Sequence, residues 1–324
     1  MTKTITIWDT SVGTRNVGDE IINDAVRKEL IDLYKKDYQF MTVPTHDIIG
    51  RYGRNILKES ECSFVAGTNI LTAKYHLLKN NQWNLRFRDL WSVRNVVLLG
   101  VGWNNYQAKT SWMNKLFYRT LFSKKVIHSV RDNYTKEKLE SIGITNVVNT
   151  GCATLWRLTP EHCATIPTHK GKQVVTTITD YRKDKTADEA MLKELKKQYG
   201  KVSLWLQGSH DEEYFETFSD EAKADVIKIP GIMDVYNDLL EKNIDLDFVG
   251  TRLHAGIRAM QKGRRAVIIG VDNRSIEMKR DWDLPVLERE NIAQLSEYIN
   301  HDFETKINLD FDLIEKWKAQ FKHE

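Results

Sequence analysis

The sequence has few of the features that mark disulfide-bonded, membrane-spanning or nucleic-acid-binding proteins. Only three of its 324 residues are cysteines. This odd, sparse set favours a reducing compartment and offers no disulfide framework. The longest apolar run, residues 96–103, is far too short to cross a bilayer. The net charge of +3 is too balanced for a polybasic nucleic-acid binder, so we expect no nucleic-acid partner.

Targeting and phosphate-binding signatures are also missing. The first nine residues have the pattern of a β-strand and not that of a signal peptide, so we expect a cytoplasmic protein. No G-x-G-x-x-G follows the first strand, and no Walker A sequence occurs. The histidines and cysteines form no cluster with metal-type spacing, so we expect no metal. Common nucleotide-binding and zinc-binding classes are therefore not indicated.

Short β-branched runs alternate with amphipathic helical patterns along the chain, which predicts parallel sheets with crossover helices. The expected strands are residues 4–8, 38–43, 62–66, 95–101, 125–130, 145–149, 173–177, 201–206, 225–229, 246–249, 266–270 and 285–287. Twelve strands are many for one sheet, and the pattern restarts near residue 172 after a polar segment. We therefore expect an α/β protein of two facing Rossmann-like domains, residues 1–160 and 172–290. The helices of residues 291–324 are expected to pack back on the first domain.

Ligands of such sheets bind at the carboxyl ends of the strands, which places the expected active site in the cleft between the domains. The most informative segment, residues 250–260, follows a predicted strand and opens a helix. Thr251 is the expected N-cap, and Arg252 and His254 lie in the first turn. Free N–H groups, the helix dipole and a guanidinium would there form a site for a phosphate or carboxylate. The alternative is a surface arginine and a histidine that only bonds its own backbone.

A second segment, residues 16–20, follows the first strand. Gly18 allows close backbone approach, and Asp19 begins the first long helix, where an acidic residue is also favourable for purely structural reasons. The position after a strand places Asn16, Asp19 and Glu20 at the expected cleft.

Further polar residues follow other predicted strands. Arg131 is either an anion ligand or half of a structural ion pair with Asp132. The remaining candidates, each also compatible with an ordinary loop, are Thr68, Asn69, His210, Asp211 and Asp272. The pair His210 and Asp211 is the best suited of these to proton transfer.

These segments together carry a family resemblance. The chain resembles the polysaccharide pyruvyltransferase family in Asn16-Val17-Gly18-Asp19-Glu20, in Ser129-Val130-Arg131-Asp132, in residues 146–153 and in Gly250-Thr251-Arg252-Leu253-His254-Ala255-Gly256 with residues 268–272. Of these, Thr-Arg-Leu-His-Ala-Gly is the specific element. The resemblance covers about residues 5 to 275 and implies a GT-B-type fold. The chain departs from the family at Cys152-Ala153 and at Ala66-Gly67-Thr68, which concerns acceptor contacts more than the donor site.

The resemblance implies ketal pyruvyl transfer, in which phosphoenolpyruvate gives its pyruvyl group to two hydroxyls of one sugar and phosphate leaves. Arg131, Arg252 and His254 match positions that resemble the family's donor-binding and catalytic residues. Two arginines complement a small phosphate-bearing carboxylate, and His254 is the first choice of general acid. Asp19, Glu20 and His210 are secondary choices for proton transfer. No step requires a metal or redox cofactor, so phosphoenolpyruvate is expected as a substrate only.

Two aromatic and basic segments, residues 82–94 and 111–125, bear on the acceptor. Such segments suit an anionic bilayer surface, although a core-facing helix with a basic outer side has the same pattern. Family members often modify glycans on polyprenyl diphosphate, which would bring the enzyme to the inner face of the cell membrane. Two other functions fit the sequence. One is a GT-B glycosyltransferase that uses a nucleotide sugar, and the other is a non-catalytic glycan- or anion-binding protein.

Overall fold

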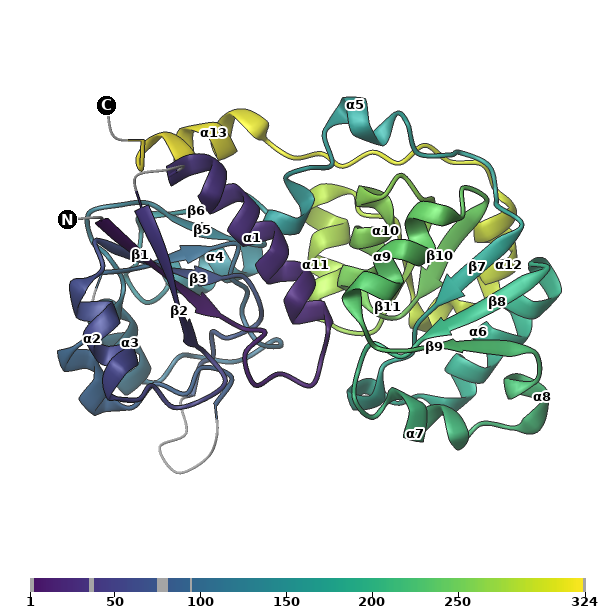
Figure 1. Ribbon diagram of the computed structural model, residues 1–324, viewed down its shortest axis with the longest axis horizontal. Coiled ribbons are helices and arrows are strands. Elements are labelled where there is room, and N and C mark those ends of the chain that lie inside the picture. Colours follow the sequence, from purple (N-terminus) through teal and green to yellow (C-terminus); the bar gives the residue numbers. More distant parts are fainter. Residues whose placement is uncertain (1–2, 35–37, 75–80, 94, 323–324) are drawn as a thin grey trace. The chain divides into compact units, whose positions relative to one another are not determined.

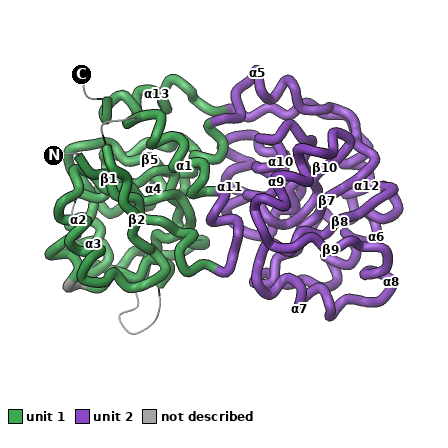
Figure 2. Tube along the Cα trace, viewed as in Figure 1, with its two compact units in different colours: residues 1–14, 22–156, 309–324 green, residues 15–21, 157–308 purple. Residues whose placement is uncertain are grey.

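A computed structural model describes residues 3–34, 38–74, 81–93 and 95–322, which divide into two compact units (Figures 1 and 2). Unit 1 comprises residues 1–14, 22–156 and 309–324, and unit 2 comprises residues 15–21 and 157–308. Arg94, part of one aromatic and basic segment, lies outside the described residues.

Unit 1 is built around parallel strands in the order β2-β1-β3-β4, with the pair β5-β6 joined to the end of β4 through a bridge between Val101 and Val130. Its strands are β1 (Lys3–Asp9), β2 (Tyr38–Pro44), β3 (Cys62–Ala66), β4 (Val96–Leu99), β5 (His128–Val130) and β6 (Val147–Asn149). Its helices are α1 (Gly18–Tyr34, whose first residues belong to unit 2), α2 (Arg51–Glu59), η2 (Phe87–Trp91), α3 (Trp112–Leu121), α4 (Asn133–Glu140), η3 (Ala153–Leu155) and α13 (Phe311–Ala319).

Alternation along the strands gives the sheet of unit 1 two apolar faces. Phe64 of β3 packs with α1 and α13, while the next residue, Val65, packs in the second core with α2, α3 and α4. A sheet covered on both sides by helices leaves its strand ends as the place where polar residues can gather.

Unit 2 has one six-stranded parallel sheet in the order β12-β11-β10-β7-β8-β9. Its strands are β7 (Gln173–Thr176), β8 (Lys201–Trp205), β9 (Val226–Ile229), β10 (Leu246–Gly250), β11 (Ala266–Gly270) and β12 (Val286–Glu288). Its helices are α5 (Pro160–Cys163), η4 (Asp180–Arg182), α6 (Lys185–Gln198), α7 (Asp211–Glu216), α8 (Asp220–Lys223), α9 (Met233–Lys242), α10 (Leu253–Gln261), α11 (Asn273–Trp282), η5 (Arg289–Gln294) and α12 (Leu295–Asn300).

The predicted α/β fold is confirmed, and each of the twelve expected strands coincides with an observed one. The strand expected over residues 95–101 is shorter, because Gly100 has a φ of +64° and ends the extended backbone. Among the described residues, no helix combines the length and apolarity needed to span a bilayer.

The boundaries of the two units differ from the expected ones, most clearly near the C-terminus. The break falls after residue 156, and residues 291–308 belong to unit 2 instead of packing on the first domain. The reason is that Leu295 and Ile299 of α12 enter the core of unit 2. Only α13 packs in unit 1, where Trp317 and Phe321 contact the ring of Phe64.

Candidate functional site

The polar loops of unit 2 gather at the carboxyl ends of β7, β8, β10 and β11. The chain runs from β7 to β8 and β9 on one side and then returns to β10 on the other side of β7. The gap between β7 and β10 is therefore a topological switch point, where open α/β sheets bind their ligands. The segments that follow these strands provide the side chains described next.

Arg252 is the centre of this cluster. Its side chain is only 2% exposed. Nε donates to the Ile178 carbonyl oxygen at 2.9 Å, and Nη2 donates to Oδ1 of Asp180 at 2.8 Å and to Oδ1 of Asp211 at 2.5 Å. Its other terminal nitrogen, Nη1, is buried without a hydrogen-bond partner in the described part of the chain. Such an unsatisfied buried donor is rare and is a direct pointer to a missing acceptor.

Asp211 faces Arg252 from the start of α7 and is fully buried. Its Oδ2 accepts from the Gly208 amide at 2.6 Å, and its Oδ1 accepts from the Asp180 amide at 3.2 Å. Burial raises the pKa of this carboxyl to about 6, although Arg252 acts in the opposite direction. Asp211 can therefore hold or release a proton near neutral pH.

Threonines connect the ends of β7 and β10. The Thr251 hydroxyl donates to the Thr177 carbonyl at 3.2 Å and shares a 2.8 Å hydrogen bond with the Thr179 hydroxyl. Thr251 is thus not the N-cap that the sequence predicted. The cap position belongs to Arg252, whose side chain makes no capping hydrogen bond.

His254 lies in the first turn of α10, a helix of nine residues. Its side chain is buried. Because the N-cap side chain is turned toward the carboxylates, the amide groups of this first turn are not capped by it. Helix N-termini of this kind favour an anion.

Tyr181 links Arg252 to a second arginine, Arg274. The guanidinium carbon of Arg252 lies 4.9 Å from the centre of the Tyr181 ring, and Nη2 of Arg274 donates to the Tyr181 hydroxyl at 2.6 Å. Arg274 is also paired with Asp272, the N-cap of α11. The predicted residue Asp272 therefore belongs to the same cluster through Arg274 and Tyr181.

Hydrogen bonds connect the segment 15–21 to the loop after β8. Oδ1 of Asn16 accepts from the Gly18 amide at 3.1 Å and from Nε2 of Gln207 at 2.6 Å. A Cβ on Gly18 would lie 2.7 Å from that Gln207 nitrogen, so a larger residue here would displace the Gln207 side chain. Arg15 lies 3.1 Å from Nε2 of His210, whose other ring nitrogen is 3.1 Å from Glu213.

Asp19 and Glu20 form the acidic first turn of α1. Asp19 is buried and Glu20 is exposed. The helix dipole favours acidic side chains in the first turn of a helix, whether they are buried or exposed.

Arg131 lies in unit 1, after β5. Its guanidinium forms a buried ion pair with Asp132, in which Nε and Nη2 are 3.0 and 2.9 Å from Oδ2. Asp132 also caps α4 by accepting from the Thr135 amide and hydroxyl. A Cβ on Gly102 would lie 2.3 Å from the guanidinium carbon, so glycine makes room for it. The structural ion pair is present, and an anion contact of Arg131 stays a prediction.

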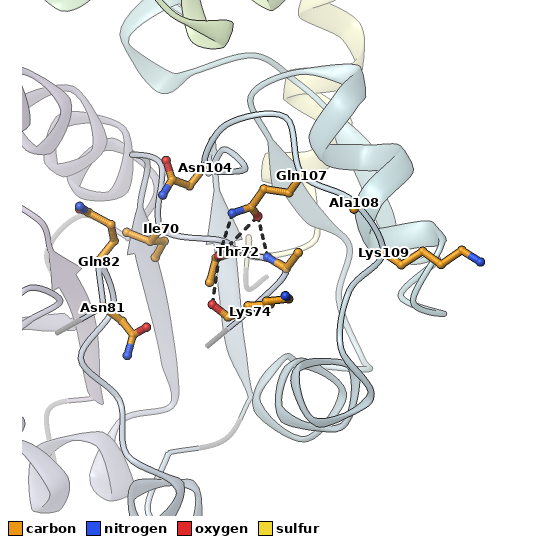
Figure 3. Close-up of a pocket in the computed structure, with 10 residues that line it drawn as sticks. Ile70, Thr72, Lys74, Asn81, Gln82, Asn104, Gln107, Ala108 and Lys109 are labelled. Atoms are coloured by element: carbon orange, nitrogen blue, oxygen red, sulfur yellow. Dashed lines mark hydrogen bonds between the residues drawn. The ribbon is translucent and has the colours of Figure 1, made fainter. Parts of the chain in front are cut away.

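Thr68 and Asn69, also in unit 1, follow β3. Thr68 has a φ of +62°, and its carbonyl accepts from the Gly102 amide at 2.8 Å. The Oδ1 atom of Asn69 is buried without a hydrogen-bond partner in the described residues. Just beyond them, a pocket of about 470 Å³ lies at the ends of β3 and β4 (Figure 3).

The predicted residues thus separate into two sets. Unit 2 contains Asn16, Gly18, Asp19, Glu20, His210, Asp211, Thr251, Arg252, His254 and Asp272, while Arg131, Thr68 and Asn69 lie in unit 1. The sequence interpretation missed Asp180, Tyr181 and Arg274. The position of Asp180 and Tyr181 directly after β7 was the signal that could have found them.

The other groups that could bind a cofactor can be checked in the same structure. In the described ranges, no three His, Cys, Asp or Glu side chains are placed together to hold a metal ion.

Comparison with known proteins gives a family and a fold. The family model for polysaccharide pyruvyl transferase matches residues 16–244, more than half of the chain. No curated protein sequence matches.

Solved structures similar to the chain include S. aureus MnaA with UDP (12% identity, TM-score 0.53, 99% of this chain and 91% of that chain covered). Another is the UDP-GlcNAc 2-epimerase of Neisseria meningitidis bound to UDP-GlcNAc (13% identity, TM-score 0.52, 98% and 100% covered). At these identities the likeness shows the GT-B-type fold alone.

Proposed function

Because the chain belongs to the polysaccharide pyruvyl transferase family, we propose that it transfers the pyruvyl group of phosphoenolpyruvate to two hydroxyls of one sugar. C2 of the donor forms two C–O bonds and loses its bond to the phosphate oxygen. C3 gains a proton, both hydroxyls lose theirs, and phosphate leaves. A cyclic ketal results. The chemistry needs acids, bases and anion-binding groups, and none of its steps calls for a metal or redox cofactor.

The buried, unsatisfied Nη1 of Arg252 carries this proposal. It lies at the switch point of the sheet, next to the uncapped first turn of α10. An oxygen of the donor's carboxylate or phosphate would satisfy it. Arg274, which donates to the Tyr181 hydroxyl and is paired with Asp272, is the second arginine of this cluster. Two anionic groups on a small molecule match two arginines.

Proton transfer can draw on two neighbours of Arg252. His254 is the proposed general acid, because an imidazole can both contact phosphate and move a proton. Asp211, with its pKa of about 6, is a second proton carrier in contact with Arg252. A carboxylate near C2 would also stabilise positive charge that develops there.

The donor assignment is tested by phosphoenolpyruvate binding and phosphate release. Arg252→Lys keeps a positive charge beside Asp211 but loses the planar fork. We expect it to weaken donor binding by about 1.5–3 kcal/mol, the scale of a lost charge-assisted hydrogen bond. Arg264→Lys is the matched control, because Arg264 bonds the Leu240 and Ile244 carbonyls of the same unit. Equal donor affinity in both variants would contradict the assignment.

The reaction is tested with a panel of lipid-linked galactose-type acceptors. We expect acceptor-dependent release of phosphate from phosphoenolpyruvate. Tight binding of a uridine or guanosine diphosphate without affinity for phosphoenolpyruvate would instead support a nucleotide-sugar glycosyltransferase. Binding of donor and glycan without turnover on any acceptor would support a non-catalytic protein.

We also propose that unit 1 docks on an anionic membrane, where a polyprenyl-linked acceptor would be found. Trp112 is 74% exposed and Leu116, one turn later on α3, is 58% exposed. Basic residues lie on the same helix and directly after it, namely Lys115, Arg119, Lys124 and Lys125. Exposed apolar residues among basic ones fit an anionic bilayer surface. The first segment contributes less than the sequence predicted, since Trp83 and Leu85 are buried in the core.

A further inference from the structure

The pocket at the ends of β3 and β4 is separate from the Arg252 cluster in sequence and lies wholly in unit 1. Its volume of about 470 Å³ falls within the roughly 300–1,000 Å³ of small-molecule sites. Its position at the carboxyl ends of parallel strands is the expected one for a ligand.

The lining contains four side-chain amides, one hydroxyl and two lysines. It consists of Ile70, Thr72, Ala73, Lys74, Asn81, Gln82, Asn104, Gln107, Ala108 and Lys109. Figure 3 shows Asn81 and Gln82 on one side of the pocket and Gln107 on the other, while the Lys109 side chain extends away. None of these side chains is a carboxylate. Neutral donors and acceptors of this kind pair with the hydroxyl groups of a carbohydrate.

One wall of the pocket is preorganised by Gln107. Its Oε1 accepts from the Ala73 amide at 2.7 Å and from the Trp103 indole at 2.8 Å, and its Nε2 lies 3.2 Å from the Thr72 hydroxyl (Figure 3). The backbone N–H of Gln107 donates to the Tyr134 hydroxyl at 2.8 Å. A side chain fixed by this many hydrogen bonds loses little entropy when a ligand binds next to it.

Helix α3 supports the pocket from behind. Asn114 donates to the Thr72 carbonyl at 2.9 Å, and the Tyr118 hydroxyl accepts from the Thr72 amide at 2.9 Å. The same helix exposes Trp112 and Leu116 on its outer side. The pocket and the membrane-docking surface are therefore two sides of one short helix. The pocket therefore lies about one helix diameter, roughly 10 Å, from the proposed membrane-docking surface.

We propose that this pocket binds the sugar of the glycan acceptor, with Gln82, Asn104 and Thr72 as hydrogen-bonding residues. The assignment of the sugar as an acceptor rests on the proposed pyruvyl transfer. The binding of a neutral, hydroxyl-rich carbohydrate does not depend on it. The site differs from the donor cluster in both charge and unit.

The test uses the full chain and a panel of water-soluble methyl glycosides of galactose, glucose, mannose and their N-acetylamino forms. Saturation-transfer NMR measures their binding without phosphoenolpyruvate. We expect Gln82→Ala/Asn104→Ala to lose at least tenfold in affinity for the glycosides that bind. The single variant Gln82→Ala changes an exposed side chain and should fold normally. A loss of affinity in this variant would therefore reflect a lost contact with the glycoside. Lys58→Ala, which changes an exposed lysine of α2 that does not line the pocket, is the control and should stay within twofold.

Measurements of phosphoenolpyruvate affinity and phosphate release distinguish a failure of the pocket assignment from a failure of the proposed function. We expect the double variant to raise the acceptor KM at least tenfold and to leave phosphoenolpyruvate affinity within twofold. Unchanged glycoside binding in the double variant, or no binding of any glycoside by the wild type at 10 mM, would overturn the pocket assignment. Glycoside binding that the double variant abolishes, in a protein that never releases phosphate from phosphoenolpyruvate, would support the pocket and refute pyruvyl transfer.

Discussion

Replacing Arg252 by alanine should destabilise the protein in a way that depends on pH. The guanidinium is the buried counterion of Asp211, at 2.5 Å, and the two side chains are only 2% and 0% exposed. Burial raises the pKa of Asp211 from 3.8 to about 6, so the folded wild type carries an ionised carboxylate only above that pH. The part of the stability that comes from the protonated carboxyl is complete below pH 3.8 and is lost as the pH rises through 6.

Without Arg252, the ionised form of Asp211 loses the guanidinium that stabilises it, and the pKa of Asp211 should rise further. The variant then keeps the carboxyl protonated, at a cost of about 1.4 kcal/mol for each pH unit above the wild-type pKa. This cost is negligible at pH 5.5, about 1 kcal/mol at pH 7 and about 3 kcal/mol at pH 8. The lost hydrogen bond to the Ile178 carbonyl adds about 1 kcal/mol at every pH. We therefore expect a loss of about 1 kcal/mol at pH 5.5 that grows to about 4 kcal/mol at pH 8.

Urea unfolding of the wild type and Arg252→Ala at pH 5.5, 7 and 8 measures this difference. Arg264→Ala is the control. Arg264 donates to the carbonyl oxygens of Leu240 and Ile244, which do not titrate, so the effect of its removal should not change with pH. Arg252→Ala/Asp211→Asn should also lose the pH dependence, because its amide cannot ionise. A destabilisation by Arg252→Ala that is equal at pH 5.5 and 8 would refute the assigned coupling between Arg252 and Asp211.

Three further predictions concern other parts of the chain. Gly102→Ala should cost about 1–3 kcal/mol in urea unfolding, because its Cβ would lie 2.3 Å from the guanidinium carbon of Arg131; Gly50→Ala, which meets nothing within 4 Å, should be nearly neutral, and equal effects would contradict this packing. His254→Ala should lower kcat more than it weakens phosphoenolpyruvate binding, as for a proton donor; a rise in KM alone would make His254 a binding residue. Trp112→Ala should reduce co-sedimentation with anionic liposomes, and added salt should weaken wild-type binding; salt-independent binding that survives the substitution would place the membrane surface elsewhere.

The sequence was sufficient for the fold because hydrophobic periodicity is a local property. Each strand is a short β-branched run bounded by polar or glycine residues, and the alternation with amphipathic helices permits only parallel sheets. The rule that ligands bind at the carboxyl ends of strands located Arg252, Asp211 and Asn16 before any contact between them was known.

Only the tertiary structure decided which of these residues act on one another. Arg252 and Asp211 are 41 positions apart, and their pairing depends on β10 and β8 lying on either side of β7. The unsatisfied Nη1 of Arg252 is visible only when every neighbouring acceptor is placed.

The assignment of surface and core likewise needed the three-dimensional fold. Trp83 and Trp112 belong to similar aromatic and basic segments, yet the first is buried in the core and the second is exposed. The composition of the two segments does not distinguish a buried tryptophan from an exposed one. Burial depends on which residues pack against each ring. A sequence therefore determines where polar side chains can gather, and the packing of distant segments determines which of them are left free to meet a ligand.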